Sequence, residues 1–198
     1  MKYRTIGADP ATAREVSVLS LGAMNFGTRT DEATSFAILD RFLEAGGNFI
    51  DTSDNYAFWV NGTQGGESEE LLGRWTRLSP DGEIGAAAGD LLDYVRADPA
   101  LTLVAYSPLI GGAYDRTDRA MWPEHDHPGT VARLAALREV AAETGAIAGQ
   151  VVLAWLMGAE VPAIPLVGAS SVAQLNESLA AVDLALSADQ RARLDAAN

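Results

Sequence analysis

Two short segments of the chain place reactive side chains directly after apolar, strand-like runs. Asp51 and Tyr56 stand five positions apart behind residues 48–50, and Tyr106 follows the run 101–105. A tyrosine hydroxyl titrates near pH ~10, so it is a poor acid at neutral pH unless a neighbouring cation lowers its pKa. An aspartate without a cation raises that pKa instead. If Tyr56 acts as an acid, it therefore needs a cation nearby.

The sequence offers few candidates for that cation. Lys2 is the only lysine, and it lies in the N-terminal segment. His125 and His127 are the only histidines, in the proline-flanked loop 123–128. That loop is either a solvated polar segment or, because His-x-His beside carboxylates can ligate, a metal site. The sequence therefore places neither the lysine nor the two histidines where they would be expected to lower the pKa of Tyr56.

The elements that must position these residues alternate between strands and helices. Strands are predicted at 19–22, 48–51, 101–106 and 163–167, after an N-terminal hairpin of 3–6 with 16–19. Helices are predicted at 31–45 behind a Thr30 cap, 67–75, 90–97, 131–144 behind Thr130, 147–157, 172–182 behind Ser170 or Ser171, and from Ser187, which has capping-box spacing to Gln190. Residues 78–89, with a proline and three glycines, are predicted to form a loop. This alternation favours a parallel β/α architecture.

Composition limits the classes of function. The 198 residues are 48% hydrophobic and 21% charged, which is typical of one globular domain, here 1–198. A net charge of −13 argues against nucleic acid and anionic lipid as partners. No apolar run reaches membrane length, and cysteine is absent, so we expect a cytoplasmic protein with neither disulfides nor cysteine-based metal sites.

Several stretches, in a fixed order, resemble the aldo-keto reductases, which are TIM-barrel oxidoreductases. They are LGAMNFG at 21–27, NFIDTSDNY at 48–56, GESE at 66–69, AYSPL at 105–109, IP at 164–165 and GAS at 168–170. Any one would be a weak match, but the ordered set is specific. The resemblance implies an α/β fold of the (β/α) TIM-barrel type, a small-molecule carbonyl substrate, and NADP(H) or NAD(H) as the cofactor.

The same resemblance implies roles for individual residues. Tyr56 matches the proton donor to the carbonyl oxygen, and Asp51 matches the anchor of a neighbouring lysine. Ser170 stands where relatives often carry an arginine or lysine for the 2′-phosphate of NADPH, and a neutral hydroxyl is a weaker partner. Further positions match those that bind the cofactor. Tyr106 would stack on the nicotinamide, Ser107, Leu109 and Gly111 would line the pyrophosphate, and Gln174, Glu177 and Ser178 would lie near the adenosine. Gly22 and Met24 match the floor of the site, and simple packing is an equal alternative for these two residues.

The chain departs from the family between its second and third barrel strands. A TIM barrel usually takes ~250 residues, and four barrel strands are evident here. By family comparison the third to sixth strands, with the catalytic lysine and histidine, are missing at an apparent junction near 76–89. The remaining first, second, seventh and eighth strands would be consecutive neighbours, because the last strand of a barrel pairs with the first. The sequence therefore predicts a partial barrel in which carbonyl reduction is very slow or absent.

Three explanations of the short chain stay open. A stretch of the native protein is missing from this sequence, or a real internal deletion has left a non-catalytic cofactor-binding or interaction protein, or two half-barrels pair as a homodimer. The last follows from the unpaired edges that a half-barrel would expose near residues 49–51 and 101–106.

Overall fold

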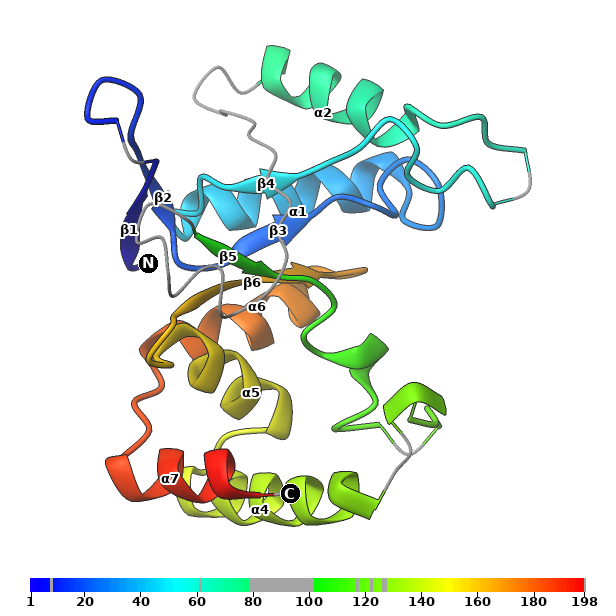
Figure 1. Ribbon diagram of the computed structural model, residues 1–198. Helices are drawn as coiled ribbons and strands as arrows, with labels where there is room; N and C mark the ends of the chain where they lie inside the picture. The colour runs from blue at the N-terminus through cyan, green and yellow to red at the C-terminus, as the bar shows by residue number, and fades with distance from the viewer. Residues whose placement is uncertain are drawn as a thin grey trace.

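The computed structural model describes residues 1–7, 9–60, 62–78, 102–116, 118–121, 123–125 and 128–197 (Figure 1). Within these ranges a central parallel sheet is covered by helices, and the N-terminal hairpin lies at one end of it. The helix predicted at 90–97 lies outside the described residues. So does nearly all of the loop predicted at 78–89.

The sheet contains four parallel strands in the order β4-β3-β6-β5. These are β3 (Ser20–Gly22), β4 (Ile50–Asp51), β5 (Leu103–Ala105) and β6 (Ala163–Gly168). Leu21 pairs with Ile50 on one side and with Val167 on the other. This is the order expected when the first and last strands of a barrel are neighbours, so the partial-barrel prediction is confirmed.

The N-terminal hairpin was also predicted, but its second strand lies two residues earlier, at 14–17 instead of 16–19. β1 (Tyr3–Ile6) pairs antiparallel with β2 (Arg14–Ser17). Val16 on β2 packs with Phe49 and Ile164 in a small buried cluster at the sheet. The hairpin thereby covers apolar side chains that the sheet would otherwise leave exposed.

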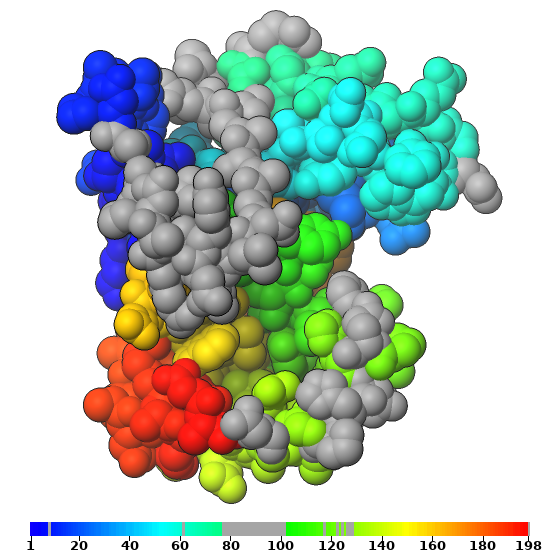
Figure 2. Space-filling view, viewed as in Figure 1, coloured from blue at the N-terminus to red at the C-terminus, as the bar shows by residue number. Residues whose placement is uncertain are grey.

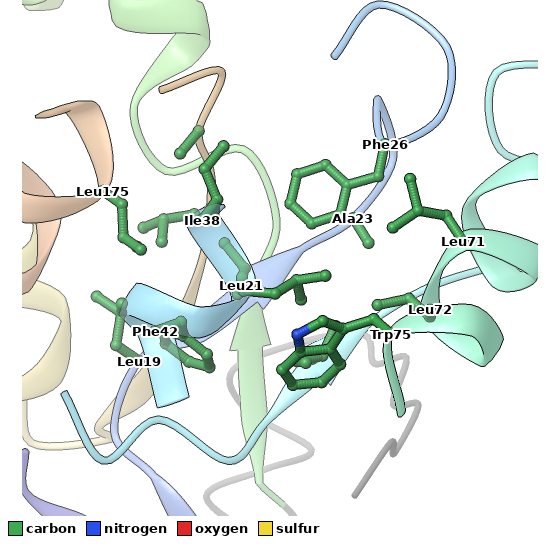
Figure 3. Packing of buried hydrophobic residues seen from close by; sticks show 14 of the residues in the cluster. Leu19, Leu21, Ala23, Phe26, Ile38, Phe42, Leu71, Leu72, Trp75 and Leu175 are labelled. Atoms are coloured by element: carbon green, nitrogen blue, oxygen red, sulfur yellow. The ribbon is translucent and has the colours of Figure 1, made fainter. Parts of the chain in front are cut away.

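The main core lies between the sheet and the helices α1 (Glu32–Glu44), α2 (Glu67–Leu78) and α6 (Val172–Ala180). Leu21 of β3 points into the centre of this core, and Trp75 of α2 closes it from one side (Figure 3). The Trp75 indole N–H donates to Asp40 of α1 at 2.8 Å, so its one polar atom is satisfied. The other buried members around them include Leu19, Ala23, Phe26, Ile38, Phe42, Leu71, Leu72 and Leu175.

A second helical group packs below the sheet in Figure 1, and its red C-terminal helix lies at the lower left of the space-filling view (Figure 2). α4 (Pro128–Thr144) packs against α5 (Ala148–Met157) and α7 (Ala188–Ala196), while the short helix η3 (Ala181–Asp183) connects α6 to this group. Their shared cluster is made of buried aliphatic side chains, namely Leu137, Val140, Ala148, Val151, Ala154 and Leu186. Two further 3₁₀ turns, η1 (Ile110–Gly112) and η2 (Pro123–His125), lie between β5 and α4.

Two of the predicted helix caps are wrong. Asp31, not Thr30, caps α1, because the Asp31 carboxylate accepts from the Thr34 backbone N–H at 2.8 Å. Helix α4 begins at Pro128 rather than after Thr130, and proline suits a first helical turn because its missing N–H would be unpaired there anyway. Ser171 is the cap of α6, and the capping box of Ser187 is confirmed.

No single helix among the described residues is both long and apolar enough to cross a membrane. The segments 129–144 and 148–157 reach that length and composition only together, and they are bent by 96° relative to each other.

Candidate active site

One pocket opens where the carboxyl ends of the four strands meet, and its volume is about 440 Å³. Active sites of β/α barrels lie at this end of the strands. The structure brings every residue predicted for catalysis or cofactor binding to the wall of this pocket: Gly22, Met24, Asp51, Tyr56, Tyr106, Ser107, Leu109, Gly111, Ser170, Gln174, Glu177 and Ser178. Their placement is thus established, whereas their individual roles stay predictions.

The Tyr56 hydroxyl donates a hydrogen bond to the carboxylate of Asp51, the last residue of β4. Burial raises the pKa of Tyr56 well above its ordinary value, and the charge and hydrogen bond of Asp51 raise it further. Tyr106 contributes a smaller effect in the same direction. Tyr56 is therefore held in its protonated form and is a weaker acid than a free tyrosine.

No lysine or histidine among the described residues lines the pocket. The Lys2 ammonium instead donates to the Val182 carbonyl at 2.6 Å and lies 3.9 Å from Asp183. His125 accepts a hydrogen bond at its carbonyl oxygen from Thr130 and is also outside the pocket. Among the residues placed by the structure there is no group of three or more metal-ligating side chains, and His127 lies outside them.

The segment after β5 forms one wall of the pocket through an unusual backbone. Ser107 and Ile110 adopt positive φ angles of 49° and 48°, which cost free energy for residues with a Cβ. Gly111 and Gly112 continue the turn at φ angles of 61° and 87°, which glycine adopts without strain. This turn leaves Tyr106 with 67% of its surface exposed, so its ring is accessible to a planar ligand.

Asp115 fastens this segment to helix α5. Its two carboxylate oxygens accept from the backbone N–H groups of Ala148 and Gly149, each at 2.8 Å. Both are first-turn amides that no intrahelical carbonyl can satisfy, and the negative charge is favourable at a helix N-terminus. No local pattern in the sequence indicates this contact, because the partners are 33 and 34 positions apart.

Another part of the pocket wall is formed by the end of β6 and the start of α6. The side-chain carbonyl oxygen of Gln174 accepts from the Ser170 backbone N–H at 2.8 Å and from its hydroxyl at 2.9 Å. The Ser171 hydroxyl caps the helix by accepting from the Gln174 backbone N–H. Ser170 thus has its donors occupied, while Glu177 brings a carboxylate to the same wall.

Arg116 and Arg119 also line the pocket, and neither was predicted. The signal in the sequence is the run Asp115-Arg116-Thr117-Asp118-Arg119 after two glycines, which composition alone cannot distinguish from a solvated loop. The exposed rings of Phe58 and Trp59 contact each other edge-to-face, with their centroids 5.0 Å apart, and neither residue lines the pocket.

The pocket residues fit a nicotinamide dinucleotide. Gly22, with no side chain, lies against Leu166 of β6, and together with Val167 they give the pocket an apolar floor. An accessible tyrosine ring stands at one wall, and polar groups lie at the other. An elongated ligand with one flat apolar end and a polar, phosphate-bearing remainder matches this distribution.

Comparison with known proteins agrees with the geometry. The sequence profile of the Aldo/keto reductase family matches residues 18–83 and 86–198. The chain is 42% identical over 80 residues to an uncharacterized 11.2 kDa protein of Pseudescherichia vulneris, covering 40% of this chain and 75% of that protein. It is 42% identical over 84 residues to norsolorinic acid reductase B of Dothistroma septosporum, covering 39% of this chain but only 19% of that reductase.

Among solved structures, an aldo-keto reductase of Bacillus halodurans in its holo form superposes with a TM-score of 0.63. The alignment covers 98% of this chain and 95% of that one at 18% identity, which supports the fold alone. The break in the family match at 84–85 falls inside the range 76–89, where the sequence predicts a junction. That junction stays a prediction.

Proposed function

Since the chain belongs to the aldo/keto reductase family of oxidoreductases, we propose that it binds NADPH or NADH and acts on the carbonyl group of a small aldehyde or ketone. One observation carries this proposal: all residues predicted from the sequence for that chemistry line a single pocket at the strand ends. Because the matched segment spans about a fifth of the norsolorinic acid reductase, that protein's substrate is not transferred to this chain.

The bound cofactor would supply a hydride to the carbonyl carbon. The chain supplies the proton, which leaves the Tyr56 hydroxyl for the carbonyl oxygen as that oxygen gains the electron pair of the double bond. Tyr56 is left as a phenolate next to the Asp51 carboxylate and recovers its proton from water. Two adjacent negative charges are unfavourable in a half-buried site, and no cation among the described pocket residues is bonded to either of them.

We therefore expect measurable affinity for the dinucleotide but a very slow rate of carbonyl reduction. The second candidate function is cofactor binding without catalysis. The raised pKa of Tyr56 favours it, because it makes Tyr56 a weaker acid. The two candidates share the pocket and differ only in turnover.

Fluorescence titration of NADPH and NADH, followed by a turnover assay with aromatic aldehydes, separates them. Saturable binding with slow turnover that Tyr56→Phe abolishes supports the reductase. Saturable binding with no turnover supports the second candidate. The absence of binding to either cofactor would refute both. Tyr56→Phe should leave cofactor affinity unchanged, because Tyr56 is assigned to the substrate's oxygen.

We also propose that the chain pairs as a homodimer through the outer strands of the sheet. Within the described residues, β4 pairs only with β3 and β5 only with β6, so each has one edge available for another strand. Light scattering at several protein concentrations tests this. A mass of twice 20.8 kDa supports the dimer, and a single species at 20.8 kDa contradicts it.

A further inference from the structure

A second cavity, of about 410 Å³, lies between the ends of helices α1 and α6. No residue lines both this cavity and the active-site pocket. We propose that it is a binding site for a small monocarboxylate with a short aliphatic chain, whose carboxylate is bound by Arg41 and Asn176. This inference does not depend on the function proposed above, because neither the dinucleotide nor the carbonyl substrate takes part in it.

The cavity lies at the other end of the helices from the active site. Helix α6 starts at the active-site pocket, where Gln174 is in the wall, and ends at the second cavity with Leu179. Helix α1 follows β3 and reaches the cavity with its last turn, which contains Arg41. Between the two ends, Ile38 of α1 and Leu175 of α6 are buried in the same core cluster (Figure 3). The core therefore holds the two walls of the cavity against each other.

Part of the cavity wall offers hydrogen-bond donors to an anion. The Arg41 Nε donates to the Asn176 Oδ1 at 2.7 Å, which joins α1 to α6 and orients the guanidinium group. Among the described residues, neither side chain has another hydrogen bond or ion pair. The Arg41 Nη groups and the Asn176 amide N–H groups are thus available to a ligand. A guanidinium group can donate two parallel hydrogen bonds to one carboxylate.

The charges around the cavity favour a monoanion. Among the described residues that line it, Arg41 has the only cationic side chain and Asp183 the only carboxylate. The Lys2 ammonium lies 3.9 Å from the Asp183 carboxylate and offsets part of its charge. One guanidinium group balances one negative charge, so a dianion such as a phosphate ester would leave a charge uncompensated on a protein whose net charge is −13. A carboxylate therefore fits this site better than a phosphate.

The rest of the wall is mostly apolar. Met1, Leu179 and Val182 line it, together with two alanines whose side chains are too small to fill it. Val182 is buried, and Met1 and Leu179 are partly buried against the main core. An aliphatic chain placed here would remove apolar surface from water, which is favourable in proportion to the area buried. The two parts of a short-chain carboxylate thus match the two kinds of surface in the cavity.

NMR of the protein labelled with methyl-¹³C methionine, titrated with hexanoate, tests the site. Met1 lines this cavity and Met24 lines the active-site pocket, so their methyl signals report the two sites separately. The chain has four methionines, and leucine substitution of the other three in turn identifies the signal of Met1. We expect a saturable shift of the Met1 signal with a Kd of about 1–10 mM, and no shift of the Met24 signal. Hexanol and hexylamine have a similar chain without the negative charge, and their Kd should be about tenfold higher.

Variants of the charged groups test the assignment of Arg41. Arg41→Gln should raise the Kd of hexanoate about tenfold, and Arg41→Lys, which keeps the charge but loses the planar fork, about threefold. Asp183→Asn removes the competing negative charge and should lower the Kd about twofold. The matched control is Arg74→Gln, at a partly exposed arginine whose ion pair with Glu32 lies outside both cavities, and it should leave the Kd unchanged.

Several results would overturn the site. A Kd of hexanoate that is the same in the wild type and in Arg41→Gln would show that the contact between Arg41 and Asn176 only joins the two helices. A shift of the Met24 signal without one of Met1 would assign the carboxylate to the active-site pocket, and no shift at about ten times the expected Kd would leave the cavity without this ligand. If Arg41→Gln does not fold, the wild type decides the question, because hexanol binding as tightly as hexanoate would exclude an anion site.

Discussion

The contact between Asp51 and Tyr56 makes a quantitative prediction. Asp51→Asn keeps a hydrogen-bond acceptor of the same shape but removes the charge that opposes ionisation of Tyr56. Two unit charges ~4 Å apart interact by about 1 kcal/mol in water and about 4 kcal/mol at the effective dielectric near a protein surface. At ~1.4 kcal/mol per pKa unit, the variant should lower the Tyr56 pKa by roughly one to three units. Carbonyl reduction by this variant, if measurable, should be no slower than that of the wild type.

Ultraviolet difference titration of tyrosinate measures this shift. The chain has five tyrosines, so the signal of Tyr56 is obtained by subtracting the titration of Tyr56→Phe in each background. Asp54→Asn is the matched control, because it removes an exposed carboxylate from the same loop without touching Tyr56. A Tyr56 titration that is the same in the wild type and in Asp51→Asn would refute the electrostatic account of this site.

Three further predictions concern stability. Gly47→Ala would place a Cβ 2.4 Å from the buried ring of Phe42, so we expect the free energy of unfolding in urea to fall by about 1–3 kcal/mol. Gly73→Ala lies within α2, and its Cβ would meet no atom within 4 Å apart from the backbone of its own helix, so we expect a gain of about 0.5–1 kcal/mol. Equal effects of the two changes would contradict the packing described for the core. Asp115→Ala should cost about 1–2 kcal/mol and weaken NADH binding, because two N–H groups of α5 lose their acceptor and the pocket wall loses its tether; unchanged stability and affinity would show that the tether is dispensable. Because the folded-state pKa of Tyr56 is raised, its protonated hydroxyl stabilises the fold below pH ~10, and this contribution is lost as the pH rises above that value. The loss of stability at alkaline pH should therefore be smaller in Tyr56→Phe than in the wild type. An identical pH profile of unfolding in the two proteins would contradict the raised pKa.

The order of the strands could be predicted from the sequence because it follows from local patterns and one topological rule. Apolar runs locate the strands, and the resemblance to the aldo-keto reductases identifies them as the first, second, seventh and eighth strands of a barrel. Because a barrel joins its last strand to its first, the order β4-β3-β6-β5 follows. The wall residues of the pocket were predicted from the same resemblance, and most of them lie at or just after the carboxyl ends of neighbouring parallel strands, where the active sites of barrels form.

The features that the sequence did not predict depend on contacts between distant residues or on close competition between neighbours. Thr30 and Asp31 are both suitable caps for α1, and the choice of Asp31 depends on its bonds to Thr34. The tether of Asp115 to α5 joins segments whose separation in the sequence contains no periodic signal. Arg116 lies in the pocket wall directly after that tether, and its backbone N–H donates to the Gly112 carbonyl.

Hydrogen-exchange mass spectrometry of the whole chain, with and without saturating NADPH, tests the central claim most directly. If the strand ends form a dinucleotide site, ligand should slow exchange in residues 105–116 and 168–178, which supply its two walls, and leave α7 and the N-terminal hairpin unchanged. Protection confined to other segments, or no protection at a saturating concentration, would contradict the claim that this pocket binds the cofactor.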